Sequence, residues 1–392
     1  MTTPRHPPAL VFCLFKYFPY GGLERDMLAI ATECHRRGYA VTAYTQSWQG
    51  TLPPWLDIHL LACDGSTNHG KARRFARQLE RALAHEPADA VVGFNKMPGL
   101  DVYFAADVCY KEYALAERSW LYRLTGRYRQ YRAFEEAVFG PDSTTHVLMI
   151  SKAQESVYVR HYRTPEARIH FLPPGVSRDS MAPSHAGDVR EGLRRELGLG
   201  ACDALLLQVG SWFVRKGVDR SIRALAALPP QIREKTHLRV IGADKPVTFV
   251  RLAARLGVDR QVRFLGGRDD VPRFLMGADL LLHPAHQETT GKVIVEALAA
   301  GLPSVVSGVC GYAHYVQEAR AGWVIPEPLD QGLFNQTVGY ALAHPETLED
   351  ARRNALAFAA REDLYGMVDA AVAAIERVLF DKRAATIPAG CP

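Results

Sequence analysis

The pattern that most constrains the fold is a strand, a glycine-containing loop and a helix, and it occurs twice. An uninterrupted apolar run at residues 9–15 is followed by such a loop and by helical periodicity over 23–37. A second run at 205–209 is followed by a similar loop and by helical periodicity that begins near Val218. Short apolar runs of this kind are typical of parallel strands buried on both faces. Each occurrence therefore predicts the start of a separate Rossmann-like sheet.

Further apolar runs of strand length support this interpretation. They lie at 40–45, 90–94, 238–241, 262–265, 280–283 and 304–307, and a further strand-like piece ends at Asp107. Helices are predicted near 271–276 and 293–300. Two prolines and a glycine at 172–179 predict a linker. We expect an α/β fold with two Rossmann-like domains, 9–175 and 176–363, facing a central cleft, and a C-terminal helix at 364–381 that packs back on the first domain. Ligands of such sheets bind outside the carboxyl ends of the strands.

Composition narrows the functional classes. The chain has 392 residues and a net charge of +5 that is spread along the sequence, which argues against a nucleic-acid partner. Its seven cysteines are scattered singly, without a Cys-x-x-Cys pair. No apolar stretch approaches membrane-spanning length, and the first eight residues do not resemble a signal peptide. We therefore expect a cytoplasmic protein.

The sharpest constellation is a pair of glutamates, Glu288 and Glu296, separated by seven residues. The first is predicted to follow a buried strand and the second to lie one turn into a helix. The backbone N–H groups of Thr290, Gly291 and Lys292 at the start of that helix suit a phosphate, and the carboxylates suit the vicinal hydroxyls of a sugar. Taken alone, the two residues leave open a capping acid and a solvated helix acid.

A second candidate is the Arg215–Lys216 pair, which follows the first strand of the second domain and precedes its first helix. Cations are disfavoured at that end of a helix unless an anion lies there. The sequence contains no Asp-x-Asp motif that could hold a metal at a diphosphate. We therefore expect the two cations and the helix termini to bind the anion, with no metal and no other cofactor.

The first domain offers weaker candidates. Gly21 and Gly22 precede its first helix, where absent side chains would allow a phosphate to approach the backbone. Asp26 lies one turn into that helix and Arg178 follows the linker. Both are predicted donor contacts. The alternatives are a solvated helix acid for Asp26 and a hinge ion pair for Arg178.

The Glu-x7-Glu spacing and the Arg-Lys pair resemble the signature of family-4 retaining glycosyltransferases, which have the two-Rossmann GT-B architecture. The segments FKYFPYGGLERD, YTQSW, FNKMPGLDVYFAADVCY and CGYAHY extend the likeness over residues 9–375, to the lipopolysaccharide core glucosyltransferase I family. The resemblance implies that Glu288 contacts the donor sugar and Glu296 the ribose, while Arg215 and Lys216 hold the diphosphate.

The same resemblance implies the reaction: retaining transfer of a hexose, glucose in the first place, from a UDP-sugar to an inner-core heptose on lipid A. The first domain would take the acceptor and the second the nucleotide sugar. Arg215, Lys216, Glu288 and Asp107 are the implied catalytic residues. Asp107 stands where family-4 enzymes often carry a histidine, which leaves its role open. Retention without an evident nucleophile implies front-face attack, with the departing phosphate oxygen taking the acceptor's proton.

Residues 111–132 interleave cations with aromatic side chains, and Leu121, Leu124, Tyr128 and Tyr131 recur at helical spacing. We predict that this segment contacts an anionic membrane surface at the inner face of the inner membrane. The predicted contacts are Lys111, Arg118, Trp120, Arg123, Arg127, Tyr128, Arg129, Tyr131 and Arg132. The alternative is a helix packed on the core with a solvated cationic rim.

Three other functional classes share features with this sequence. A nicotinamide dehydrogenase should show Gly-x-Gly-x-x-Gly after its first strand, and neither half has that motif. A sugar-nucleotide epimerase or hydrolase of the same architecture stays open. So does a non-catalytic membrane-surface binder, although it would have no use for Glu288, Glu296, Arg215 and Lys216.

Overall fold

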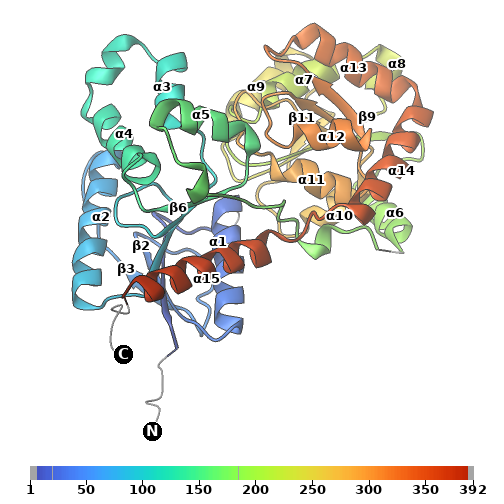
Figure 1. Cartoon of the computed structure of the whole chain (residues 1–392). Helices are drawn as coiled ribbons and strands as arrows, with labels where there is room; N and C mark the ends of the chain where they lie inside the picture. Colours follow the sequence, from blue (N-terminus) through green and yellow to red (C-terminus); the bar gives the residue numbers. More distant parts are fainter. Residues whose placement is uncertain (1–6, 20, 184, 387–392) are drawn as a thin grey trace. The chain divides into compact units, whose positions relative to one another are not determined.

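A computed structural model describes residues 7–19, 21–183 and 185–386 (Figure 1). Its contacts divide the chain into two compact units. Unit 1 contains the chain up to Pro173 together with the segment that begins at Gly366, and unit 2 contains Pro174–Tyr365. Each unit is built on one sheet of parallel strands.

Unit 1 has a seven-stranded sheet in the order β3-β2-β1-β4-β5-β6-β7. Its strands are β1 Ala9–Cys13, β2 Ala40–Thr45, β3 Asp57–Leu60, β4 Ala90–Gly93, β5 Val102–Ala105, β6 His146–Met149 and β7 Ile169–Phe171. The α-helices are α1 Gly22–Arg36, α2 Asn68–His85, α3 Tyr110–Glu117, α4 Gly126–Phe139, α5 Lys152–Tyr162 and α15 Met367–Thr386. Two 3-10 helices, η1 Trp120–Leu124 and η2 Glu166–Arg168, lie between them in sequence.

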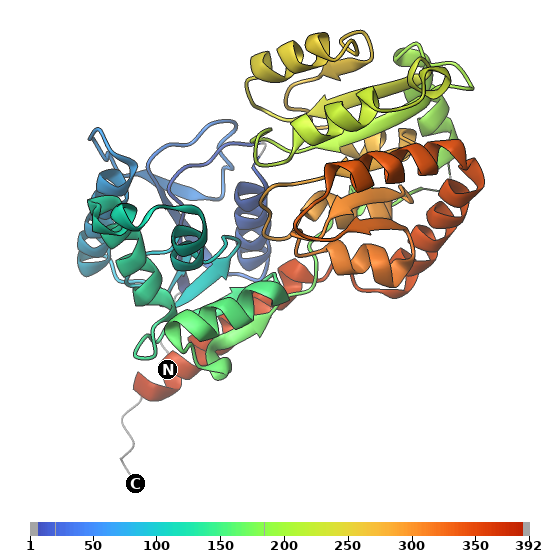
Figure 2. The same ribbon diagram turned by 90° about the horizontal axis from the view of Figure 1, so that it is seen from above.

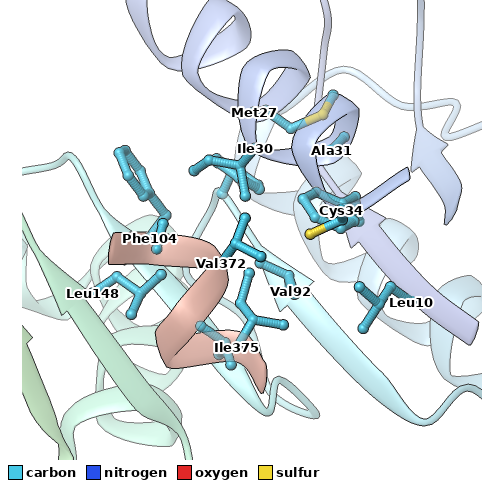
Figure 3. Packing of buried hydrophobic residues seen from close by; sticks show 14 of the residues in the cluster. Leu10, Met27, Ile30, Ala31, Cys34, Val92, Phe104, Leu148, Val372 and Ile375 are labelled. Carbon is cyan, nitrogen blue, oxygen red and sulfur yellow. The ribbon is translucent and has the colours of Figure 1, made fainter. Parts of the chain in front are cut away.

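Helix α15 is last in sequence but belongs to unit 1, as both views show (Figure 1, Figure 2). Its buried side chains Val372 and Ile375 pack in one cluster with Leu10 of β1, Val92 of β4 and Ile30 of α1 (Figure 3). This helix therefore covers one face of the sheet beside α1, and burial of its apolar stripe stabilises that face.

Unit 2 has a six-stranded sheet in the order β10-β9-β8-β11-β12-β13. Its strands are β8 Ala204–Val209, β9 Thr236–Ile241, β10 Val262–Phe264, β11 Leu280–His283, β12 Ser304–Ser307 and β13 Gly322–Ile325. The helices are η3 Arg178–Ser180, α6 Ala186–Glu196, α7 Val218–Ala226, α8 Pro230–Arg233, α9 Val247–Arg255, α10 Val271–Gly277, α11 Lys292–Ala299, α12 Ala313–Ala319, α13 Gln331–Ala343 and α14 Pro345–Arg361.

The strand order of each sheet reverses at one place, between β1 and β4 in unit 1 and between β8 and β11 in unit 2. Loops that leave two such strands diverge to opposite faces of the sheet, and this is where doubly wound proteins bind ligands. The predicted α/β fold class is confirmed, because both units are parallel sheets covered by helices. The structure adds the strands β3, β6, β7 and β13, which the apolar runs did not indicate.

The prediction that Leu121, Leu124, Tyr128 and Tyr131 share one helical face is wrong, because the first two lie in η1 and the last two in α4. The chain leaves the helix at Arg118, where α3 ends, forms η1, and starts α4 after Thr125. The Thr125 hydroxyl accepts the N–H of Tyr128 at 3.2 Å and so caps α4. Gly126 is therefore the first residue of α4.

Candidate donor site and the acidic end of unit 1

The loops after β8 and β11 carry the predicted catalytic residues of unit 2. The two strands are paired, with Leu280 opposite Leu206, so their carboxyl ends meet at the reversal of strand order. Gln287 and Arg215 join the loops, since the Arg215 Nε–H donates to the Gln287 carbonyl at 3.2 Å. The backbone N–H of His286 donates to the Arg215 carbonyl at 2.9 Å. These bonds fix the two loops against each other.

An ion pair joins the predicted residues directly, because the Lys216 ammonium contacts the Glu288 carboxylate. The Glu288 side chain is 8% exposed and that of Lys216 19% exposed. Burial alone would raise the pKa of Glu288. The positive charge of Lys216, together with the hydrogen bonds that Glu288 accepts from Lys216 and His283, instead holds this pKa well below the usual range. Glu288 is therefore ionised at neutral pH and can accept hydrogen bonds from hydroxyl groups.

His283, the last residue of β11, is fully buried and lies with its Nε2 3.2 Å from Glu288 Oε2. Burial lowers its pKa, although the neighbouring carboxylate acts in the opposite direction. A neutral ring can donate from Nε2 to Glu288, and its Nδ1 has no hydrogen-bond partner among the described residues. Sequence reasoning placed His283 only as a strand end. The one signal in the sequence that could have identified His283 is that it is a polar residue at the end of an apolar run.

Two glycines shape the helix starts at this site. Gly217 precedes α7 with φ +70°, and a Cβ there would lie 1.9 Å from the Pro284 carbonyl oxygen. Gly291 precedes α11 with φ +80°. Both backbones require the left-handed region that favours glycine. In addition, the side-chain amide of Gln208 in β8 donates to the Lys216 carbonyl at 2.7 Å, which fixes the loop after β8 against its own strand.

The other predicted donor contacts of unit 2 divide into two groups. Glu296 is 8% exposed and lies within α11, so the alternative of a solvated helix acid is wrong. Thr290 is also buried, and Lys292 is the first residue of α11. Arg178 lies in η3, where its guanidinium stacks on the Tyr365 ring at 5.6 Å.

In unit 1 the loop after β1 ends at α1, which starts with Gly22 and has Gly21 as its cap residue. Asp26 is only 8% exposed, so it is not a solvated helix acid. Glu24, which the sequence did not single out, is 7% exposed. Burial, and less strongly the charges of Asp26 and Asp107, raise its pKa to about 7 against an opposing backbone hydrogen bond.

The Glu24 carboxyl folds back over the glycine loop. A Cβ at Gly21 would lie 1.7 Å from Glu24 Oε2. The predicted phosphate-binding backbone is therefore partly covered by an acid that titrates near neutral pH. Because the first acid in a helix is an ordinary feature of helix starts, only its burial in the structure distinguishes Glu24.

Asp107 is exposed, and the loop that carries it is fixed by hydrogen bonds to its backbone. The Tyr158 hydroxyl donates to the Asp107 carbonyl at 2.9 Å. The Lys96 ammonium donates to the Val108 carbonyl at 2.9 Å, and the Cys109 N–H donates to the Gln154 side chain at 3.0 Å. Asp107 thus lies on a fixed backbone, and its carboxylate forms no hydrogen bond or ion pair with any other described residue.

A buried carboxylate, Glu135 of α4, anchors the same region. It accepts hydrogen bonds from Lys96 at 2.7 Å, from the Tyr162 hydroxyl at 2.7 Å and from the backbone N–H of Tyr110 at 2.8 Å. Burial alone would raise the pKa of Glu135, but the charge of Lys96 outweighs it and the pKa is lowered. Glu135 therefore stays charged and caps the start of α3. Glu135 could not be recognised as buried from the sequence, because it lies among the apolar residues Phe134 and Val138 of α4 with no motif of its own.

The predicted membrane segment is partly corrected. Tyr128 is buried and Tyr131 half-buried against Tyr110, and Lys111 donates to the His161 carbonyl at 3.1 Å. These three side chains are packed against the protein because they fall on the inner side of α3 and α4. The remaining predicted contacts are exposed: Arg118, Trp120, Arg123, Arg127, Arg129 and Arg132, joined by Leu121 and Leu124.

The described residues contain neither a side-chain cluster suited to a metal ion nor a membrane-spanning helix. No group of three or more His, Cys, Asp or Glu side chains in that part of the chain is arranged to hold a metal ion. None of its helices is long and apolar enough to cross a membrane.

Comparisons with known proteins bear on both units. Residues 189–358 match the family model for glycosyl transferases group 1, and residues 20–180 match that for glycosyltransferase family 4. The chain is 46% identical over 362 residues to lipopolysaccharide glucosyltransferase WaaG of Escherichia coli K12, covering 92% of this chain and 97% of the relative. It is 30% identical to a D-inositol 3-phosphate glycosyltransferase of Streptomyces scabiei, over 91% of this chain and 85% of that one.

Solved structures agree. The crystal structure of WaaG, described as a glycosyltransferase involved in lipopolysaccharide biosynthesis, superposes with a TM-score of 0.92 at 46% identity, covering 93% of this chain and 99% of that one. Anabaena HepE in complex with UDP-glucose shares the fold, with a TM-score of 0.73 at 18% identity over 94% of this chain and 99% of that one.

Proposed function

This chain belongs to the glycosyltransferase family that includes Escherichia coli WaaG, and on that premise we propose that it transfers a hexose, glucose in the first place, from a UDP-sugar to an inner-core heptose of lipopolysaccharide with retention of configuration. The observation that carries the proposal is the buried Lys216–Glu288 pair at the reversal of strand order in unit 2. It combines a fixed cation for a leaving phosphate with a charged acceptor for sugar hydroxyls.

The donor is assigned by chemistry. Arg215 and Lys216 take the diphosphate beside the starts of α7 and α11, whose N–H groups add positive potential. Glu288 accepts from hydroxyls of the sugar and Glu296 from those of the ribose. The name of WaaG supports glucose, and a UDP-sugar donor is supported by the HepE structure, which has the same fold and is in complex with UDP-glucose.

The proposed step breaks the bond between the anomeric carbon and the phosphate oxygen. The acceptor hydroxyl oxygen bonds to that carbon from the same face, and its proton passes to the departing phosphate oxygen. The extra negative charge on UDP is stabilised by Lys216 and Arg215. A cation about 4 Å from that charge contributes on the order of 4 kcal/mol at a near-surface dielectric. Asp107 is proposed to face the reacting centre.

We also propose that no metal takes part and that the protein acts in the cytoplasm at the inner face of the inner membrane, where the lipid A-linked acceptor resides. The absence of an Asp-x-Asp motif supports the first point. Trp120, Leu121 and Leu124, exposed by 67%, 55% and 61%, support the second because exposed arginines accompany them.

The test is release of UDP by the purified protein from a panel of UDP-hexoses, with heptose-terminated lipopolysaccharide as acceptor and EDTA present. Acceptor-dependent release with one preferred donor is expected. Release that ignores the acceptor would instead indicate a hydrolase, and release abolished by EDTA would contradict metal independence. No release with any donor would leave only a binding role.

A further inference from the structure

Helix α2 carries a row of arginines that neither the donor site nor the predicted membrane segment uses. Arg73, Arg77 and Arg81 recur every four residues and are all exposed. Side chains at this spacing lie in one row along a helix. The buried side chains of Ala72, Phe75 and Leu79 lie on the opposite side of α2. The row therefore points away from the core of unit 1.

The charges of this row are uncompensated. Within the described residues, none of Arg73, Arg77 and Arg81 forms an ion pair. Glu80 is the sole acidic residue in Asn68–His85. Like charges four residues apart destabilise an isolated helix. A row of this kind costs stability in the free chain and gains it when an anionic partner lies along the helix.

The position of α2 indicates which anion it meets. Helix α2 packs against α4, and the two lie side by side in Figure 1. The exposed arginines of α4 and the apolar side chains of η1, Trp120, Leu121 and Leu124, thus belong to the same neighbourhood of unit 1. A membrane surface presents phosphate groups that the arginines of two neighbouring helices can contact, and its acyl chains can take up the apolar side chains of η1. A nucleic acid would leave the leucines without a partner.

We propose that Arg73, Arg77 and Arg81 form a second contact with anionic phospholipid headgroups, beside the segment 118–132. The proposal rests on the proposed function for its setting at the inner membrane. The row spans about 12 Å along the helix axis, a length over which several headgroups can be reached. The two contacts together determine how firmly unit 1 holds to the membrane.

The experiment measures binding of the full chain to vesicles by cosedimentation. Vesicles of phosphatidylcholine alone are compared with vesicles that also contain phosphatidylglycerol. The test variant carries Arg73→Gln, Arg77→Gln and Arg81→Gln. A charge-matched control carries Arg251→Gln, Arg255→Gln and Arg260→Gln, three exposed arginines of unit 2. Each α2 arginine is expected to contribute about fivefold, so the test variant should bind the anionic vesicles on the order of 100-fold more weakly.

The control should lose only the small part that depends on overall charge. Equal loss in both variants, no loss in the test variant, or loss that is the same on neutral vesicles would each overturn the proposal. So would a row that binds RNA but not vesicles. The melting temperature of the test variant should not fall, because removing like charges does not destabilise the helix. An inactive wild type with intact charge-dependent binding would refute the proposed function and leave this inference standing.

Discussion

Replacing Lys216 by methionine removes the cation that both neutralises Glu288 and faces the proposed leaving diphosphate. The change keeps most of the side chain's length and apolar stem. Loss of one fixed transition-state donor lowers kcat about 100- to 1,000-fold in comparable sites. Arg215 and the helix starts remain, so we expect this range rather than complete inactivity.

The same substitution leaves a buried carboxylate without its counter-ion. Removing one partner of a buried pair costs about 3 to 5 kcal/mol, and the partial exposure of Lys216, 19%, places the expected loss at the lower end. Without Lys216 the pKa of Glu288 should rise, since burial then dominates over the bond with His283. The double variant Lys216→Met, Glu288→Gln should recover stability but not activity.

The assay is initial rate of acceptor-dependent UDP release together with thermal unfolding. Lys245→Met, at an exposed lysine of unit 2 outside the site, is the control. A Lys216→Met enzyme that keeps kcat within about threefold of wild type would refute the role given to this cation. A double variant no more stable than Lys216→Met would refute the account of the pair.

Three further predictions concern single sites. Because burial raises the pKa of Glu24 to about 7 from 4.5, the folded chain holds a proton there that the unfolded chain has released. The free energy of unfolding should therefore fall by about 3 kcal/mol as pH rises through this window. Glu24→Gln should remove that fall in pH-dependent denaturant titrations, and an unchanged slope would contradict the burial. Glu135→Gln leaves Lys96 without its counter-ion and should lower stability by about 3 kcal/mol or more by urea unfolding; a loss below about 1 kcal/mol would argue against the anchor. Gly217→Ala meets the Pro284 carbonyl and should destabilise more than Gly257→Ala, where φ is also +70° but nothing lies within 4 Å; equal melting temperatures would exclude the steric contact.

The fold could be predicted from the sequence at most of the central, apolar strands, although β6 was missed despite its buried Val147, Leu148 and Met149. The runs that became β1, β4, β8 and β11 are buried along their whole length or nearly so, so hydrophobicity alone marks them. The missed strands β3 and β7 lie at sheet edges and are partly exposed. Their residues alternate too briefly to give a pattern.

The candidate site could be predicted only in part. Lys216 and Glu288 lie next to strand ends, where the topology of parallel sheets brings loops together. Glu24, Glu135 and His283 could not be singled out, because their importance comes from burial and from partners far away in sequence. Tyr128 and Tyr131 were placed on the surface in error, because a single helical period was assumed to continue from η1 into α4 across Thr125.

The central claim is that this chain transfers glucose to a heptose with retention, using the site that contains Lys216 and Glu288. The most direct test is NMR of the purified product formed from UDP-α-glucose and a heptose-terminated core oligosaccharide. We expect an α-linked glucose on the heptose, formed by the wild type and formed about 100- to 1,000-fold more slowly by Lys216→Met. A β-linked product, or free glucose as the sole product, would contradict it.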